Sequence, residues 1–377
     1  MVPRKISGIR IDESDYFEDR EEDETAAWRA HLVEIMSHFS TMSELTIGFL
    51  DLARFPAERR TQVLRPGQAQ RALIVQWLRV EHAGEATSFI LNQPDITFLG
   101  IGAVTLARNA NEKDGKDEER VEEEEGGETV ENDSVAIVAL PPSWTEPTVR
   151  LDRLRHLCLF SDSGRLTWSH VVPLLAEGTL AELTTLIAEC HDREAFVRLI
   201  GAAAPALRSL AVSFNGPGVD IDISKARSLT NLSIGLAMYP ANEHVLADTV
   251  ATISSAPPTV ERVFLNIGPT TIETEQQLDG ASLLWATLDN RLVAMPQLRR
   301  VIIIIVFDNC ISMLMGMTGG SGGFVEKWKL DALNYIRKWL PLCEAKGLVE
   351  VKDATGSWTT SAFAGYNLPE KTAWRTV

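Results

Sequence analysis

The sequence lacks most of the features that would identify a secreted domain, a metal-binding module or a membrane protein. Its four cysteines lie far apart with no CxxC pair, which argues against a disulfide framework or a structural zinc site. The N-terminus has no apolar core of a secretory signal. The most apolar window, residues 301–317, contains Asp308 and is too short to span a bilayer. We therefore expect a soluble protein of the cytoplasm or nucleus that does not associate with membranes.

The two signs of charge are unevenly distributed, and the formal net charge of −16 is concentrated in two acidic segments. Residues 11–24 carry nine acids and one base, and residues 111–133 carry twelve acids and three bases. Such runs repel themselves and cannot bury apolar surface. We predict a disordered acidic leader at 1–25 and a disordered acidic insertion at 109–134. Basic patches with interleaved aromatic residues are missing, so nucleic-acid binding is not expected.

Motifs that carry catalysis are missing as well. The glycine-rich stretch at 316–323 follows an apolar run, but no Lys-Ser/Thr pair comes directly after it, so it predicts a linker rather than a phosphate loop. The Cys-His-Asp tripeptide at 190–192 consists of neighbours that point different ways, and it indicates a half-buried cysteine before a polar turn. Asp220 and Asp222 have no further ligands nearby and are typical of a solvated face. We expect no catalytic residue, no cofactor and no metal.

What the sequence does contain is a degenerate repeat with the frame LxxLxL. Leu207, Leu210 and Val212 in LRSLAVSFN define it, and the frame recurs from residues 42, 96, 154, 183, 229, 260 and 298. Period-two apolar positions predict a strand with one buried face. Helices are predicted between these strands at Ala195–Ala203, His244–Ser254 and Ser282–Val293. Units of this kind cannot bury their apolar faces alone, so they stack and share one core.

The repeat predicts an α/β fold, an irregular leucine-rich-repeat-like solenoid with parallel strands stacked in sequence and helices on the convex side. We place this domain at 26–353. An amphipathic capping helix is expected at 324–342, after the linker, and a C-terminal tail at 354–377. The apolar run at 301–305 is then the last strand of the series, covered on both faces.

Three stretches carry a resemblance to a known group. LLWATLDNRLVAMPQLRRVIIII at 283–305, LPLCEAKGLVEV at 340–351 and EATSFILNQPDITFLGI at 85–101 resemble fungal F-box/leucine-rich-repeat-like proteins. The resemblance covers residues 26–353. It implies that an F-box would hold a Skp-type adaptor of a cullin–RING ubiquitin ligase while the repeats hold the substrate. An F-box helix is not visible before the first repeat, so the chain's start is incomplete or the module was lost.

We interpret the chain as a non-catalytic scaffold that binds a partner protein on its concave strand face. One alternative is the substrate-recognition subunit of a cullin–RING ligase, and another is an enzyme on a doubly wound sheet, in which the strand order reverses at a switch point. The predicted protein-binding residues are the outward strand positions. They are His156, Phe160, Thr185, Glu189, Asn231, Arg262, Phe264, Asn266 and Arg300.

Overall fold

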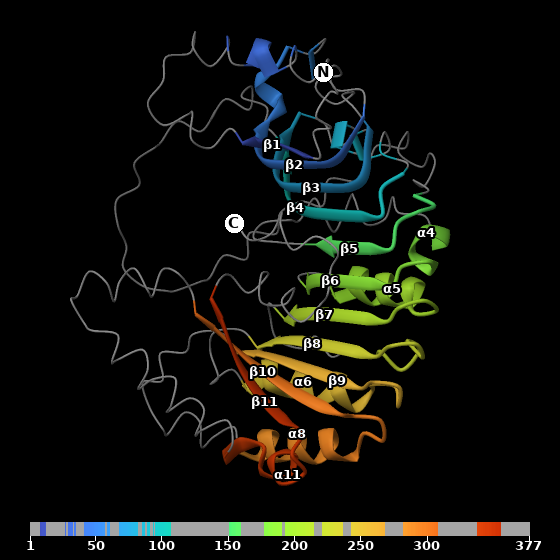
Figure 1. Cartoon of the computed structure of the whole chain (residues 1–377), viewed down its shortest axis with the longest axis vertical. Coiled ribbons are helices and arrows are strands. Elements are labelled where there is room, and N and C mark those ends of the chain that lie inside the picture. Colours follow the sequence, from blue (N-terminus) through green and yellow to red (C-terminus); the bar gives the residue numbers. More distant parts are fainter. Residues whose placement is uncertain are drawn as a thin grey trace, which may run out of the picture.

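The fold is built on one large parallel sheet, as the computed structural model shows. The structure describes residues 8–12, parts of 27–34, 41–56, 59–60, 68–81, parts of 85–97, 98–106, 151–159, 177–190, 193–214, 221–236, 243–267, 282–307 and 338–355. Within these residues, eleven strands pair in sequence order (Figure 1). They are β1 (Gly8–Asp12), β2 (Thr41–Asp51), β3 (Gln68–Val80), β4 (Phe98–Leu106), β5 (His156–Leu159), β6 (Thr185–Cys190), β7 (Ser209–Phe214), β8 (Asn231–Leu236), β9 (Arg262–Ile267), β10 (Arg300–Phe307) and β11 (Val349–Thr355).

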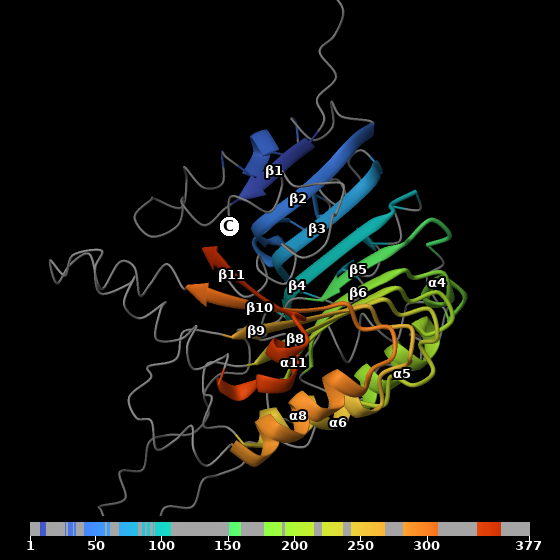
Figure 2. The same cartoon turned by 60° about the horizontal axis from the view of Figure 1, so that its bottom comes forward.

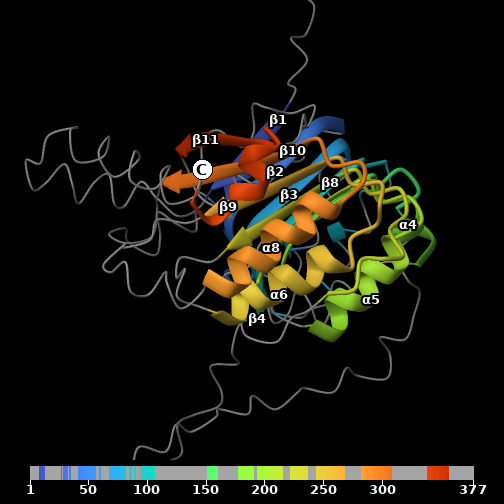
Figure 3. The same cartoon turned by 90° about the horizontal axis from the view of Figure 1, so that it is seen from below.

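Helices cover one face of this sheet. The described ones are α4 (Glu177–Ala181), α5 (Arg193–Ala203), α6 (Glu243–Ser254), α8 (Ser282–Ala294) and α11 (Pro341–Ala345), with a 3-10 turn, η2 (Leu52–Arg54). Figures 2 and 3 show α4, α5, α6 and α8 together along the same side. The predicted α/β class is therefore confirmed, and α5, α6 and α8 coincide with the three predicted helices. No helix in the described ranges is long and apolar enough to cross a membrane.

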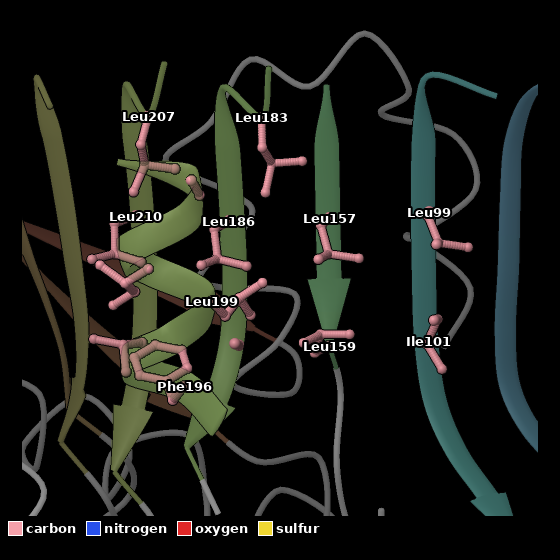
Figure 4. Packing of buried hydrophobic residues seen from close by; sticks show 14 of the residues in the cluster. Leu99, Ile101, Leu157, Leu159, Leu183, Leu186, Phe196, Leu199, Leu207 and Leu210 are labelled. Carbon is pink, nitrogen blue, oxygen red and sulfur yellow. The ribbon is translucent and has the colours of Figure 1, made fainter. Parts of the chain in front are cut away.

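The predicted apolar frame is the buried core between strands and helices. Leu210 of β7 stands in register between Leu186 of β6 and Leu232 of β8, and all three are fully buried. Alternation along each strand sends every second side chain to this side, which we call the helix face. In Figure 4 the leucines of β5, β6 and β7 face the apolar side of α5, from which Phe196 and Leu199 project. Burial of each such side chain stabilises the fold by about 1.5–3 kcal/mol.

Hydrogen bonds at the strand starts add a second repeating feature. The hydroxyl of Thr184, just before β6, donates to the carbonyl oxygen of Arg155 at 3.0 Å. Thr230 donates in the same way to the carbonyl of Arg208 at 3.1 Å. Thr97 repeats the contact with the carbonyl of Arg71 at 3.1 Å. Arginine and threonine thus alternate from β3 to β8 at equivalent positions near the strand starts. Each threonine hydroxyl donates to the carbonyl oxygen of the arginine at the start of the preceding strand, which can accept more than one hydrogen bond.

Strands β1, β3 and β11 were not predicted. Gly8–Asp12 lies in the expected disordered leader, yet it forms β1 and pairs with β2, so that prediction does not hold for these residues. In β3, Gln70 occupies the place where the frame expects a leucine, three residues before the buried Leu73. Strand β11 extends to Thr355 and so overlaps the expected tail. The sheet is longer at both ends than the repeat indicated.

The C-terminal cap is also organised differently from the single helix predicted at 324–342. Lys338 and Trp339 are helical, Leu340 is not, and α11 then begins at Pro341. Proline lacks an amide hydrogen and suits the first turn of a helix, so a new helix starts there. Gly347, with φ of 67°, turns the chain from α11 into β11, and this left-handed conformation favours glycine. The remainder of that prediction, the acidic insertion and the glycine-rich linker lie outside the described residues.

Candidate functional site

The face of the sheet opposite the helices is the candidate site. In-register pairing arranges its side chains in rows across the strands. We call the first of these the first row; from β4 to β10 it consists of Phe98, His156, Thr185, Ser209, Asn231, Arg262 and Arg300. The second row follows two residues later and runs through Cys158, Ile187, Ala211, Ser233, Phe264 and Ile302. The third comprises Glu189, Ser213, Gly235, Asn266, Ile304 and Lys352.

The predicted binding residues gather on this face. His156, Thr185, Asn231, Arg262 and Arg300 all belong to the first row. Phe264 belongs to the second row, and Glu189 and Asn266 belong to the third. Phe160 lies outside the described residues. Residues separated by as much as 144 positions in the sequence therefore share one line only because the strands stack in order, from His156 to Arg300.

Side-chain exposure differs sharply along this face. Several of the residues predicted to contact a partner are buried. Phe264 is only 3% exposed and clusters with Ile302 and Ile304 of the next strand. Asn266 is completely buried, and Thr185 is 8% exposed. Phe264 points away from the helices as predicted, but it is a core residue of a second, smaller apolar cluster. The exposed members of the predicted set are Arg262 and Arg300.

Asparagines of β8 and β9 tie neighbouring strands together through serine hydroxyls. Nδ2 of Asn231 donates to Oγ of Ser209 at 3.0 Å. Nδ2 of Asn266 donates to Oγ of Ser233 at 2.7 Å. In both residues the amide oxygen Oδ1 is buried and has no hydrogen-bond partner in the part of the chain that the structure describes. An unsatisfied buried acceptor costs about 1–3 kcal/mol, so each is a place where a donor would stabilise the structure.

Burial shifts the pKa of two titratable groups on this face, His156 and Cys158, in the direction of the uncharged form. Burial, reinforced by the neighbouring Arg155, lowers the pKa of His156. Burial, together with the charge of Glu189, raises the pKa of Cys158 well above its ordinary value of 9.0. A cysteine nucleophile needs a lowered pKa to supply thiolate at neutral pH. The environment of Cys158 acts in the opposite direction and does not prepare it for catalysis.

The other chemical motifs lie elsewhere. Cys190 ends β6, and the two residues that follow it lie outside the described ranges. Asp222 is exposed, and its Oδ1 accepts a hydrogen bond from the backbone N–H of Ser224 at 2.9 Å, which is a local turn. Hydrogen bonding by Ser224 lowers the pKa of Asp222. Within the described part of the chain, histidine, cysteine, aspartate and glutamate form no group of three suited to a metal ion.

Exposed arginines also stand at the starts of the strands, outside the set of residues predicted from the sequence. Arg208 precedes β7 and Arg299 precedes β10, and both are exposed. The alternation of arginine and threonine before the strands was a visible signal for Arg208. The alternation alone does not show which arginines lie together. Sequential stacking of the strands brings Arg208, Arg262, Arg299 and Arg300 to the end of the sheet where the strands begin.

Comparison with known proteins adds no assignment: no family model, no curated protein and no solved structure matches this chain.

Proposed function

We propose that this chain is a leucine-rich-repeat-like solenoid that serves as a non-catalytic scaffold and binds a partner protein through the face opposite its helices. The sequential order of parallel strands and the buried LxxLxL positions support the solenoid. A doubly wound enzyme fold would reverse its strand order at a switch point. The described strands run in a single order, which argues for the solenoid over that alternative.

One observation carries the functional proposal. The first row places Asn231, Arg262 and Arg300 side by side on three consecutive strands, with both arginines exposed. Arginine is enriched at protein interfaces because its planar guanidinium donates several hydrogen bonds and packs on flat surfaces. Neighbouring strands lie about 4.8 Å apart, so these three side chains form a continuous polar line that a partner can contact.

Affinity purification with quantitative mass spectrometry tests the proposal. The bait pair is the full chain and its Arg262→Ala/Arg300→Ala variant. Arg198→Ala/Arg291→Ala removes the same charge from exposed positions on α5 and α8 and serves as the matched control. A specific partner should be lost from the first variant and retained by the control. Equal recovery by both variants contradicts binding at this face. A Skp-type adaptor among the retained proteins would indicate the ligase role.

A further inference from the structure

Two arginines stand next to each other on the candidate face without a charge between them. Arg300 of β10 is the in-register neighbour of Arg262 of β9, and both side chains are exposed. Like charges directly opposite each other on a sheet are destabilising. This pair therefore works against the fold in the free protein, and an anion held between the two guanidiniums would remove that cost.

The surrounding charges leave this pair only partly compensated. Arg300 approaches Glu350 of β11 at 3.4 Å, and Arg299 approaches Glu261 at 3.6 Å. Both contacts are long, and each joins an exposed arginine to a half-buried glutamate, so solvent still screens them and each contributes little. Arg262 has no acidic partner within 4.0 Å among the described residues. An excess of positive charge thus remains at this edge, although the chain as a whole carries a formal charge of −16.

An acceptor next to the arginines indicates what kind of anion fits. Asn231 is the neighbour of Arg262 on the other side of the row, and it is half-buried. Among the described residues its Oδ1 has no hydrogen-bond partner, while its Nδ2 donates to Ser209 and Thr230. If the amide turns outward, Oδ1 can accept a hydrogen bond from a peptide N–H. The two guanidiniums can bind a carboxylate, and the amide oxygen can accept a hydrogen bond from a backbone N–H. An acidic peptide supplies both groups.

We propose that the first row binds an acidic segment of the partner protein, with one carboxylate bridging Arg262 and Arg300 and an adjacent peptide N–H donated to Asn231. The inference rests on the proposed function, since it names the chemistry of the partner for the same face. Arg208, exposed and two strands away from Arg262, would meet a further carboxylate along the same extended segment.

Fluorescence anisotropy with the full chain tests this chemistry directly. The probe is a labelled extended peptide of about ten residues with Glu or Asp at every second position, because alternate side chains of a strand share one face. A control peptide carries Gln and Asn at those positions. Arg262→Ala/Arg300→Ala should weaken binding of the acidic peptide by about tenfold or more. Arg198→Ala/Arg291→Ala, which removes the same charge from the helices, should leave it unchanged.

A substitution that leaves the charge unchanged separates the contribution of Asn231 from that of the two arginines. Asn231→Leu should weaken the acidic peptide by a smaller factor of about 3–10, as expected for loss of one hydrogen bond. Circular dichroism and melting curves verify that each variant is folded. Because the arginine pair is repulsive, Arg262→Ala/Arg300→Ala should melt no lower than the unmodified chain.

Several results would overturn the inference. Equal weakening by both double variants would mean that only net charge matters. Equal binding of the acidic and amide peptides would remove the role of the carboxylate. Tighter arginine-dependent binding of a single-stranded oligonucleotide of equal charge would assign the face to nucleic acid. If the peptide does not bind but partner capture still depends on Arg262 and Arg300, this inference fails while the proposed function stands.

Discussion

Asp289 of α8 caps Cys343 of α11: the aspartate Oδ1 accepts a hydrogen bond from the cysteine N–H at 2.9 Å. Its other oxygen accepts from the N–H of Leu342 at 2.7 Å. Asp289 is 1% exposed, so one buried carboxylate satisfies two otherwise unpaired donors at the start of the last helix. Trp285, one turn earlier in α8, stacks on Trp339 with ring centroids 4.7 Å apart. These contacts hold the end of the sheet in place.

Asp289→Ala should therefore destabilise the protein by about 1–3 kcal/mol, the cost of leaving buried donors unpaired. The loss is measured by urea unfolding followed by circular dichroism. In the variant, hydrogen exchange of backbone amides should accelerate more in β11 than in β7, because the contacts of Asp289 with α11 anchor β11. Asp222→Ala is the matched control, since its carboxylate caps an exposed turn, and it should change stability by less than about 1 kcal/mol. Equal losses would show that the cap is not specific.

Leu210→Ala should cost about 2–5 kcal/mol, because Leu210 is completely buried between two strands and the helices. Ser209 lies on the opposite face of the same strand, is 8% exposed and accepts the hydrogen bond from Asn231. Ser209→Ala should cost about 0.5–1.5 kcal/mol. Chemical denaturation of both variants measures the difference, and equal costs would contradict the assigned strand faces.

The repeat frame predicted the strands from β5 to β10 because it depends on local alternation. Leu210 and Val212 face the helices whatever their neighbours are. Strand β3 was missed because Gln70 breaks the frame. Strand β1 was missed because Asp12 begins a run of acids that indicated disorder. In both cases pairing with a neighbouring strand outweighed the local signal.

Burial on the face opposite the helices could not be predicted in the same way. The frame placed Phe264 on that face correctly but could not show what packs against it. Ile302 and Ile304 arrive there from β10, about 40 residues later in the sequence, and their positions follow from register. The pairing of Arg262 with Arg300 on adjacent strands was hidden for the same reason. The face to which a side chain points depends on one strand and was predictable from the sequence. Burial and charge pairing on that face depend on the neighbouring strand, so they required the structure.

Gly102→Ala should be strongly destabilising. A Cβ atom added to Gly102 of β4 would lie 2.1 Å from the backbone carbonyl oxygen of Gln76 in β3, so the strands would have to separate. Overpacking of this kind costs about 1–3 kcal/mol or more. Gly201→Ala is the matched control, because nothing lies within 4 Å of a Cβ at that position of α5. It should stabilise the helix by about 0.5–1 kcal/mol. Thermal melting compares the two, and similar shifts would contradict the close approach of β3 and β4.

His156 should make the protein sensitive to mild acid. Burial and Arg155 lower the pKa of His156 from its ordinary value of 6.5, so the unfolded chain binds a proton at a pH where the folded chain does not. Stability is therefore retained above pH 6.5 and falls as the pH drops from there to the folded pKa. The slope for one such group is at most about 1.4 kcal/mol per pH unit.

His156→Phe isolates this contribution, since the new ring keeps an aromatic contact with Phe98, whose ring centroid lies 6.4 Å from that of His156. Urea unfolding from about pH 7.5 to about pH 5.5 gives the free energy of unfolding of both proteins. The unmodified chain should lose more stability over this range than the variant. All other histidines are common to both proteins, so the difference reports His156 alone. Parallel pH profiles would mean that protonation of His156 does not oppose folding, and that the imidazole is solvated in the native state.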